Sequence, residues 1–65
     1  GEHFAAIADY SHALELDNTF AQAYYNRALA RMLAYNRTDA CYDFEQAMEL
    51  GYEEAAQKLE QFCSF

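Results

Sequence analysis

The chain contains no proline and no tryptophan, and only two of its 65 residues are glycine. Turn-rich all-β domains, collagen-like repeats and disordered linkers are richer in proline or glycine than this. Hydrophobic residues make up 54% of the chain, which is also more than a disordered segment carries. The composition therefore predicts a folded domain of the all-α class.

Basic residues are scarce as well. Four lysines and arginines stand against eleven aspartates and glutamates, which gives a formal net charge of −7 at pH 7. A charge of this sign is repelled by nucleic-acid phosphates and by anionic lipid headgroups. No apolar run reaches the roughly 18 residues that a membrane-spanning helix needs. We therefore expect neither nucleic acid nor a membrane as the partner.

The usual signatures of catalysis are missing too. The sequence has no glycine-rich phosphate loop, no nucleophile motif and no zinc-ligand pattern. His3 and His12 are nine residues apart, a spacing that does not bring two ligands to one face of a helix. We expect no catalytic residue, no metal and no cofactor, so a binding or structural function is favoured over an enzymatic one.

Apolar periodicity predicts four helices: two at about residues 3–17 and 20–35, a third that runs to Leu50, and a fourth at about 53–63. The sequence Thr19-x-x-Gln22 has the form of a capping box at the start of the second helix. Asn36 or Thr38 can cap the third helix, and Gly51 suits the left-handed position that ends a helix.

The most informative pattern is an internal repeat, whose period of about 34 residues falls in the range that marks stacked structural units. Its first copy reads Ala6-x3-Tyr10-x2-Ala13-Leu14-Glu15-Leu16, and its second reads Ala40-x3-Phe44-x2-Ala47-Met48-Glu49-Leu50. Asp9 and Asp43 are in register as well. The period and the residues resemble the tetratricopeptide repeat, a pair of antiparallel helices that stacks on neighbouring pairs. The resemblance implies a fragment of an α-solenoid built from helix-turn-helix repeats.

The resemblance also implies a division of the chain. Residues 1–20 correspond to the second helix of a partial repeat, residues 21–54 to one complete repeat, and residues 55–65 to a capping helix. The chain would then form the C-terminal end of a repeat array. The positions where the helices of the complete repeat pack together are occupied by Tyr24, Ala28, Ala40, Phe44 and Ala47.

A further implication of the resemblance is function, because this family binds proteins or peptides in a groove lined by the first helices of its repeats. Asn26 resembles an asparagine with which some members hold a peptide backbone or a terminal carboxylate. The prediction is a non-catalytic module for protein–protein interaction, and the alternative for the same residues is a solvated helix face. The partner-binding positions implied by the resemblance are Gln22, Tyr25, Asn26, Leu29 and Leu33.

Two other functions are compatible with the sequence. The apolar side of the first helix lacks its usual neighbour, so it could pair with a second copy of the chain in a homodimer or by exchange of helices. The domain could also be an accessory part of an enzyme whose active site lies elsewhere in a longer polypeptide.

Arginine is concentrated in the middle of the chain. Residues 21–37 carry three arginines and no acid, whereas the segments on both sides are acidic. Arg27 and Arg31 are one helical turn apart, and Asp9 and Asp43 belong to the flanking helices. We expect a structural ion pair between Arg27 and one of these aspartates. The alternative is a clamp for the carboxylate of a partner.

The two cysteines are predicted to be neighbours. Cys41 precedes Gly51 by ten residues and Cys63 follows Tyr52 by eleven, so an antiparallel hairpin brings them to the same level. One hypothesis is a disulfide, which would contribute roughly 3 kcal/mol and imply an oxidising compartment. The other hypothesis is a pair of small, buried, reduced thiols.

Overall fold

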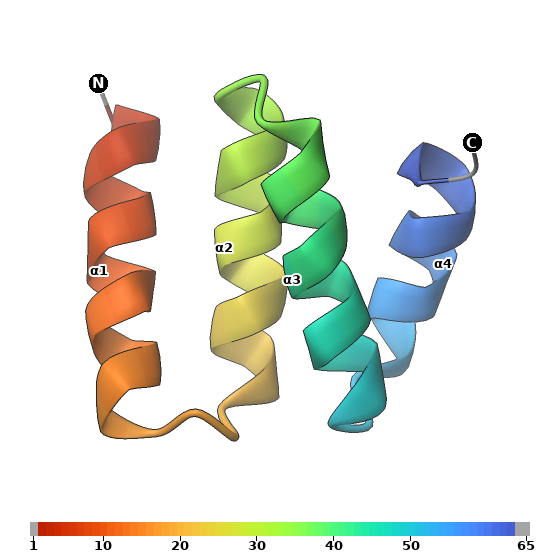
Figure 1. Ribbon diagram of the computed structural model, residues 1–65, viewed down its shortest axis with the longest axis horizontal. Helices are drawn as coiled ribbons and strands as arrows, with labels where there is room; N and C mark the ends of the chain where they lie inside the picture. Colours follow the sequence, from red (N-terminus) through yellow and green to blue (C-terminus); the bar gives the residue numbers. More distant parts are fainter. Residues whose placement is uncertain (1, 64–65) are drawn as a thin grey trace.

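The computed structural model describes residues 2–63, and these residues form four helices and no strand. The helices lie side by side in chain order, each antiparallel to the next, with α1 and α4 at the two ends of the row (Figure 1). The expected all-α fold of helix-turn-helix pairs is confirmed. None of the helices within residues 2–63 has the length and apolarity to span a membrane. Their bounds are Glu2–Leu16 for α1, Ala21–Leu33 for α2, Arg37–Glu49 for α3 and Glu53–Phe62 for α4.

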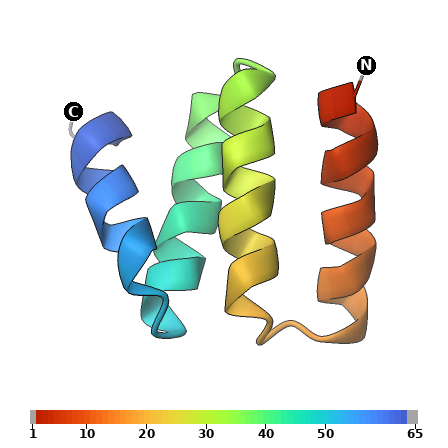
Figure 2. The same ribbon diagram turned by 180° about the vertical axis from the view of Figure 1, so that it is seen from behind.

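The two inner helices carry most of the packing. Helix α2 packs against both α1 and α3, and α3 packs against both α2 and α4. Figure 2 shows the row from behind, where α2 stands in front of α3. One face of the molecule therefore presents the outward side of α2, and the opposite face presents α3.

The core lies where α2, α3 and α4 meet. It is built largely from alanines, because a small side chain lets two helix backbones approach closely, and the Phe44 ring fills the space between them. Of the five packing positions implied by the sequence, Tyr24 is half-buried and packs against the edge of the core, and the other four have no exposed surface. The buried core residues are Tyr25, Ala28, Ala40, Phe44, Ala47 and Ala55.

Helix α3 has a cap at each end. Asn36 is its N-cap residue, and the Asn36 side chain accepts a hydrogen bond from the Asp39 backbone N–H at 3.4 Å. Gly51 ends the helix with a φ of +97°, a left-handed conformation that costs glycine little. The Tyr52 N–H then donates to the carbonyl of Ala47, which satisfies one of the last free carbonyls of the helix.

The expected capping box at the start of α2 is wrong. Phe20 is the N-cap residue, and no side chain caps the helix there. The Thr19 hydroxyl instead donates to Asp17 Oδ1 at 2.6 Å, and the Thr19 N–H donates to the same oxygen at 3.0 Å. These bonds lower the pKa of Asp17. Thr19 lies one residue before the N-cap, and both of its donors are directed to the charged carboxylate of Asp17, which is a strong acceptor.

Candidate partner-binding surface

A line of four residues runs along one side of α2. Gln22, Asn26, Leu29 and Leu33 follow one another at intervals of four, three and four residues, which places them on a single helical face. We call these four residues the α2 stripe. Gln22 is exposed, Asn26 and Leu29 are half-buried, and Leu33 is 61% exposed. Leu29 also packs against the core, so only part of its side chain is open to a ligand. The α2 stripe is thus accessible, polar in its N-terminal half and apolar in its C-terminal half.

The amides of the α2 stripe have hydrogen-bonding capacity to spare. Among residues 2–63, no hydrogen bond engages the side chain of Gln22 or Asn26. A primary amide offers donors and an acceptor on one planar group, which is the complement of a peptide backbone. The stripe therefore presents two unengaged amides and an exposed leucine on one face of α2.

Tyr25, the fifth residue implied by the sequence, lies in the core and is not part of this open surface. It is 9% exposed, and its ring meets that of Phe44 edge-on at 5.7 Å and that of Tyr52 at 4.8 Å between centroids. Burial, followed by the negative charge of Glu54, raises the pKa of Tyr25. The ring therefore joins α2 to α3 and to the turn before α4.

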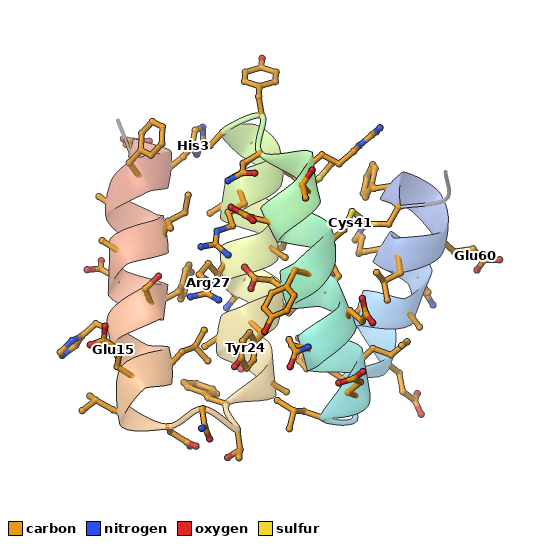
Figure 3. All side chains as sticks on the ribbon, in the orientation of Figure 1. His3, Glu15, Tyr24, Arg27, Cys41 and Glu60 are labelled. Atoms are coloured by element: carbon orange, nitrogen blue, oxygen red, sulfur yellow. A yellow bond between two sulfur atoms is a disulfide. The ribbon has the colours of Figure 1, made fainter. Side chains whose placement is uncertain are left out.

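An ion cluster fixes α2 against α3. Asp43 of α3 is fully buried, and it accepts hydrogen bonds from Arg27 Nε at 2.9 Å and Arg27 Nη2 at 2.7 Å. Arg31 Nη1 donates to the same carboxylate at 2.7 Å. Arg27 Nη1 also donates to Ser11 Oγ at 3.1 Å, which ties α1 to the cluster. Arg27 lies between α1 and α3 in Figure 3.

The cluster is held by internal partners. The hydrogen bonds from Arg27 to Asp43 raise the pKa of the arginine, and its guanidinium carbon lies 5.6 Å from the centroid of the Tyr24 ring. Both carboxylate oxygens of Asp43 are engaged, and both Arg27 and Arg31 donate to them, so the two arginines take part in a structural ion cluster. Asp9, the other candidate for the ion pair, is exposed and takes no part.

The cysteines join α3 to the end of α4. Cys41 and Cys63 form a disulfide with their Cα atoms 5.9 Å apart, and Figure 3 shows the sulfur–sulfur bond beside the Cys41 label. The bond closes the α3–α4 hairpin opposite its turn. Helix α4 is therefore fixed at both ends.

Two residues that stabilise the packing of the helices were not predicted from the sequence. Ser11 completes the ion cluster and Tyr52 stacks on Tyr25, but an isolated serine or tyrosine carries no signal of either role. Within the described part of the chain, no group of three or more potential metal ligands comes together. His12 lies 3.9 Å from Glu15 on the surface of α1, and His3 is exposed.

The first half of the chain matches a known family of repeats. A family model described as a TPR repeat matches residues 1–33, which is just over half of the chain and includes α1, α2 and the turn between them. No curated protein and no solved structure matches the chain.

Proposed function

Because the chain belongs to the tetratricopeptide repeat family, whose non-catalytic repeats mediate protein–protein interaction, we propose that it binds a protein or peptide through the α2 stripe. The observation that carries the proposal is the partly accessible face formed by Gln22, Asn26, Leu29 and Leu33 on α2, a helix that packs against both α1 and α3. Unengaged amides and an exposed leucine on one rigid helix are suited to recognition.

The chemistry of the stripe describes its ligand. The Asn26 amide is placed to hold the backbone of an extended segment, while Leu33 and Leu29 take an apolar side chain further along. A net charge of −7 slows the approach of acidic partners and favours neutral or basic ones. The expected ligand is a short segment with an apolar side chain and without a run of acids.

The surface is also preorganised. The Arg27–Asp43 pair holds α2 against α3, and Arg27 reaches α1 through Ser11. A binding face on a helix fixed from two sides loses little further conformational freedom on association. The core and the ion cluster thus contribute to binding indirectly, by keeping the α2 stripe in place.

A peptide selection with matched variants tests the proposal. Peptides are first selected from a random display library for binding to the wild-type chain. Each selected peptide is then titrated into the wild type, into the double variant Asn26→Ala/Leu33→Ser and into a control double variant, Gln46→Ala/Tyr42→Ser. The control pair matches the test pair, since Gln46 is half-buried and Tyr42 is 56% exposed on α3. We expect the stripe variant to lose at least about tenfold in affinity, since hot-spot contacts are worth about 2 kcal/mol or more, and the control to stay within about twofold.

Circular dichroism and thermal melting serve as controls for folding, because all four substituted side chains keep some exposure to solvent. A selection that returns no peptide, or only peptides that bind both variants equally well, would contradict the placement of the site on α2.

A further inference from the structure

The turn between α2 and α3 carries a motif that the proposed function does not use. Asn36-Arg37-Thr38 has the form Asn-x-Thr with a residue other than proline in the middle, which is the acceptor sequence for N-linked glycosylation. The chain has two more asparagines, Asn18 and Asn26, but neither is followed by serine or threonine at the second position. The acceptor sequence therefore occurs only at this turn.

The structure leaves the acceptor sequence open to solvent. Asn36, Arg37 and Thr38 are all exposed, and Tyr35, the residue before them, is 98% exposed. The α2–α3 turn lies at the top of Figure 1, beyond the ends of the neighbouring helices. A bulky sugar chain attached here would leave the molecule without meeting a packed helix.

The side chain of Asn36 can carry a sugar and still cap α3. N-linked glycosylation modifies the amide nitrogen of asparagine, Nδ2. The capping hydrogen bond uses the other end of the amide, because Asn36 Oδ1 accepts it from the Asp39 N–H. Nδ2 has two hydrogens, and its one hydrogen bond, to Asp39 Oδ2 at 2.8 Å, uses only one of them. The cap and the modification therefore use different atoms of the same side chain.

The disulfide supplies an independent indication of the compartment. Both cysteines of the chain are used in the bond between Cys41 and Cys63. Such bonds persist in oxidising compartments, including the lumen of the endoplasmic reticulum, and are rare in the cytosol, where thiols are kept reduced. N-linked sugars are attached in that same lumen. A covalent bond between α3 and α4 and an acceptor sequence on another part of the fold thus indicate one compartment.

We propose that Asn36 is a site of N-linked glycosylation and that the chain enters an oxidising secretory compartment. The donor is an oligosaccharide carried on a lipid pyrophosphate. A bond forms between Asn36 Nδ2 and the anomeric carbon of the first sugar, and the bond from that carbon to the pyrophosphate oxygen breaks. The lipid pyrophosphate leaves with the bonding electrons, and the proton lost from Nδ2 passes to solvent.

Thr38 has the part in this reaction that the acceptor sequence requires. Its hydroxyl makes no hydrogen bond within residues 2–63, so it is available to the transferase that recognises the acceptor. Thr38 is a recognition residue and does not react itself. Replacing it tests the site without touching Asn36 or the cap of α3.

Protein isolated from the cells that produce it provides the direct test. Free thiols are alkylated without reduction, and peptide-N-glycosidase then removes the sugar in heavy-oxygen water, which converts the modified asparagine to a labelled aspartate. Mass spectrometry should place the label at Asn36 and at neither Asn18 nor Asn26. The labelled molecules should carry no alkyl group on Cys41 or Cys63. Absence of the label at Asn36, or alkylated cysteines in the labelled molecules, would overturn the proposal.

Matched variants test the acceptor on this fold. The full chain is expressed behind a cleavable secretion signal in cultured animal cells, and glycosylation is measured as a gel shift that peptide-N-glycosidase reverses. The wild type should show the shift, and Thr38→Val should lose it because the hydroxyl is gone. Thr38→Ser keeps the hydroxyl and should keep the shift. Circular dichroism and thermal melting establish that the variants are folded.

Two results of this experiment would contradict the proposal. A shift that persists in Thr38→Val would place the sugar elsewhere, and a wild-type chain secreted without a shift would show that the turn is not an acceptor. The proposal does not depend on partner binding by the α2 stripe. The stripe variant Asn26→Ala/Leu33→Ser should therefore show the same shift as the wild type, whatever its effect on peptide affinity.

Discussion

Arg27 donates two parallel hydrogen bonds to the carboxylate of Asp43, from Nε at 2.9 Å and from Nη2 at 2.7 Å, and Asp43 has no exposed surface. A buried carboxylate with this geometry compensates for its own loss of hydration only while its cations are present. The pair also connects the two helices whose contact forms most of the core. We therefore expect the fold to depend strongly on this pair.

Asp43→Asn should be strongly destabilising for this reason. It removes the charge but keeps the volume, which leaves Arg27 and Arg31 largely buried without a counter-ion. We expect the free energy of unfolding to fall by about 3 kcal/mol, as for other buried pairs that lose one partner. Urea denaturation followed by circular dichroism measures the change.

The control is Glu45→Gln, which removes a charge from an exposed position on the same helix. It should alter the free energy of unfolding by less than about 0.5 kcal/mol. If both variants lose the same small amount, the cluster is not what holds α2 to α3.

The buried phenol of Tyr25 should make the folded protein less stable at alkaline pH. Burial raises the pKa of its phenol in the folded state above the ordinary value of 10.0, so the folded protein holds this proton more tightly than the unfolded chain. The contribution to stability is fully present below pH 10 and is lost as the pH rises through the folded-state pKa. The loss is measured by comparing the melting temperatures of the wild type and of the Tyr25→Phe variant between pH 8 and about 11.5. The variant should lose less stability across this range, and identical pH profiles would show that the phenol does not contribute.

The helices and the core alanines could be predicted from sequence because their signal is local and periodic. A constant repeat period with alanine at fixed positions identifies which sides of the helices approach closely. The left-handed Gly51 was predictable for a similar reason, since it depends on the chemistry of a few adjacent residues. The sequence offered Asn36 or Thr38 as the cap of α3, and the structure uses Asn36.

Contacts that involve three helices were harder to predict from the sequence. The sequence placed Tyr25 among the partner-binding residues, but the ring of Tyr52 covers it from the distant turn between α3 and α4, and no local pattern shows such a contact. The choice of Asp43 over Asp9 as the partner of Arg27 was open for the same reason, because both aspartates occupy equivalent repeat positions. The hydrogen bonds from Thr19 to Asp17 were missed because the capping-box pattern considers only the residues from Thr19 onward.

Tyr35 occupies an unfavourable backbone conformation that a substitution should relieve. Its φ is +61°, in the left-handed region, and its side chain is 98% exposed, so it gains no packing there. Asparagine tolerates this conformation better than tyrosine does. Tyr35→Asn should raise the free energy of unfolding by roughly 0.5–1 kcal/mol, measured by urea denaturation. Tyr35→Phe keeps the unfavourable left-handed conformation and should leave the free energy of unfolding unchanged. If Tyr35→Asn and Tyr35→Phe stabilise the protein equally, the effect comes from loss of the phenol hydroxyl and not from the backbone.

The disulfide between Cys41 and Cys63 should determine how firmly α4 is held. Helix α4 packs mainly against α3, and Ala55 is its one fully buried residue among those described. Because α4 buries little apolar surface, the disulfide supplies much of its attachment to α3. For a loop of this size, a dithiol reductant should lower the free energy of unfolding by about 3 kcal/mol. Amide hydrogen exchange in α4 should accelerate more than exchange in α2, because α2 keeps its contacts with α1 and α3. The Cys41→Ser/Cys63→Ser variant should have the lower stability with or without reductant. If the reductant changes neither the stability nor the exchange of the wild type, packing alone fixes α4, and the two thiols would serve equally well as a reduced pair.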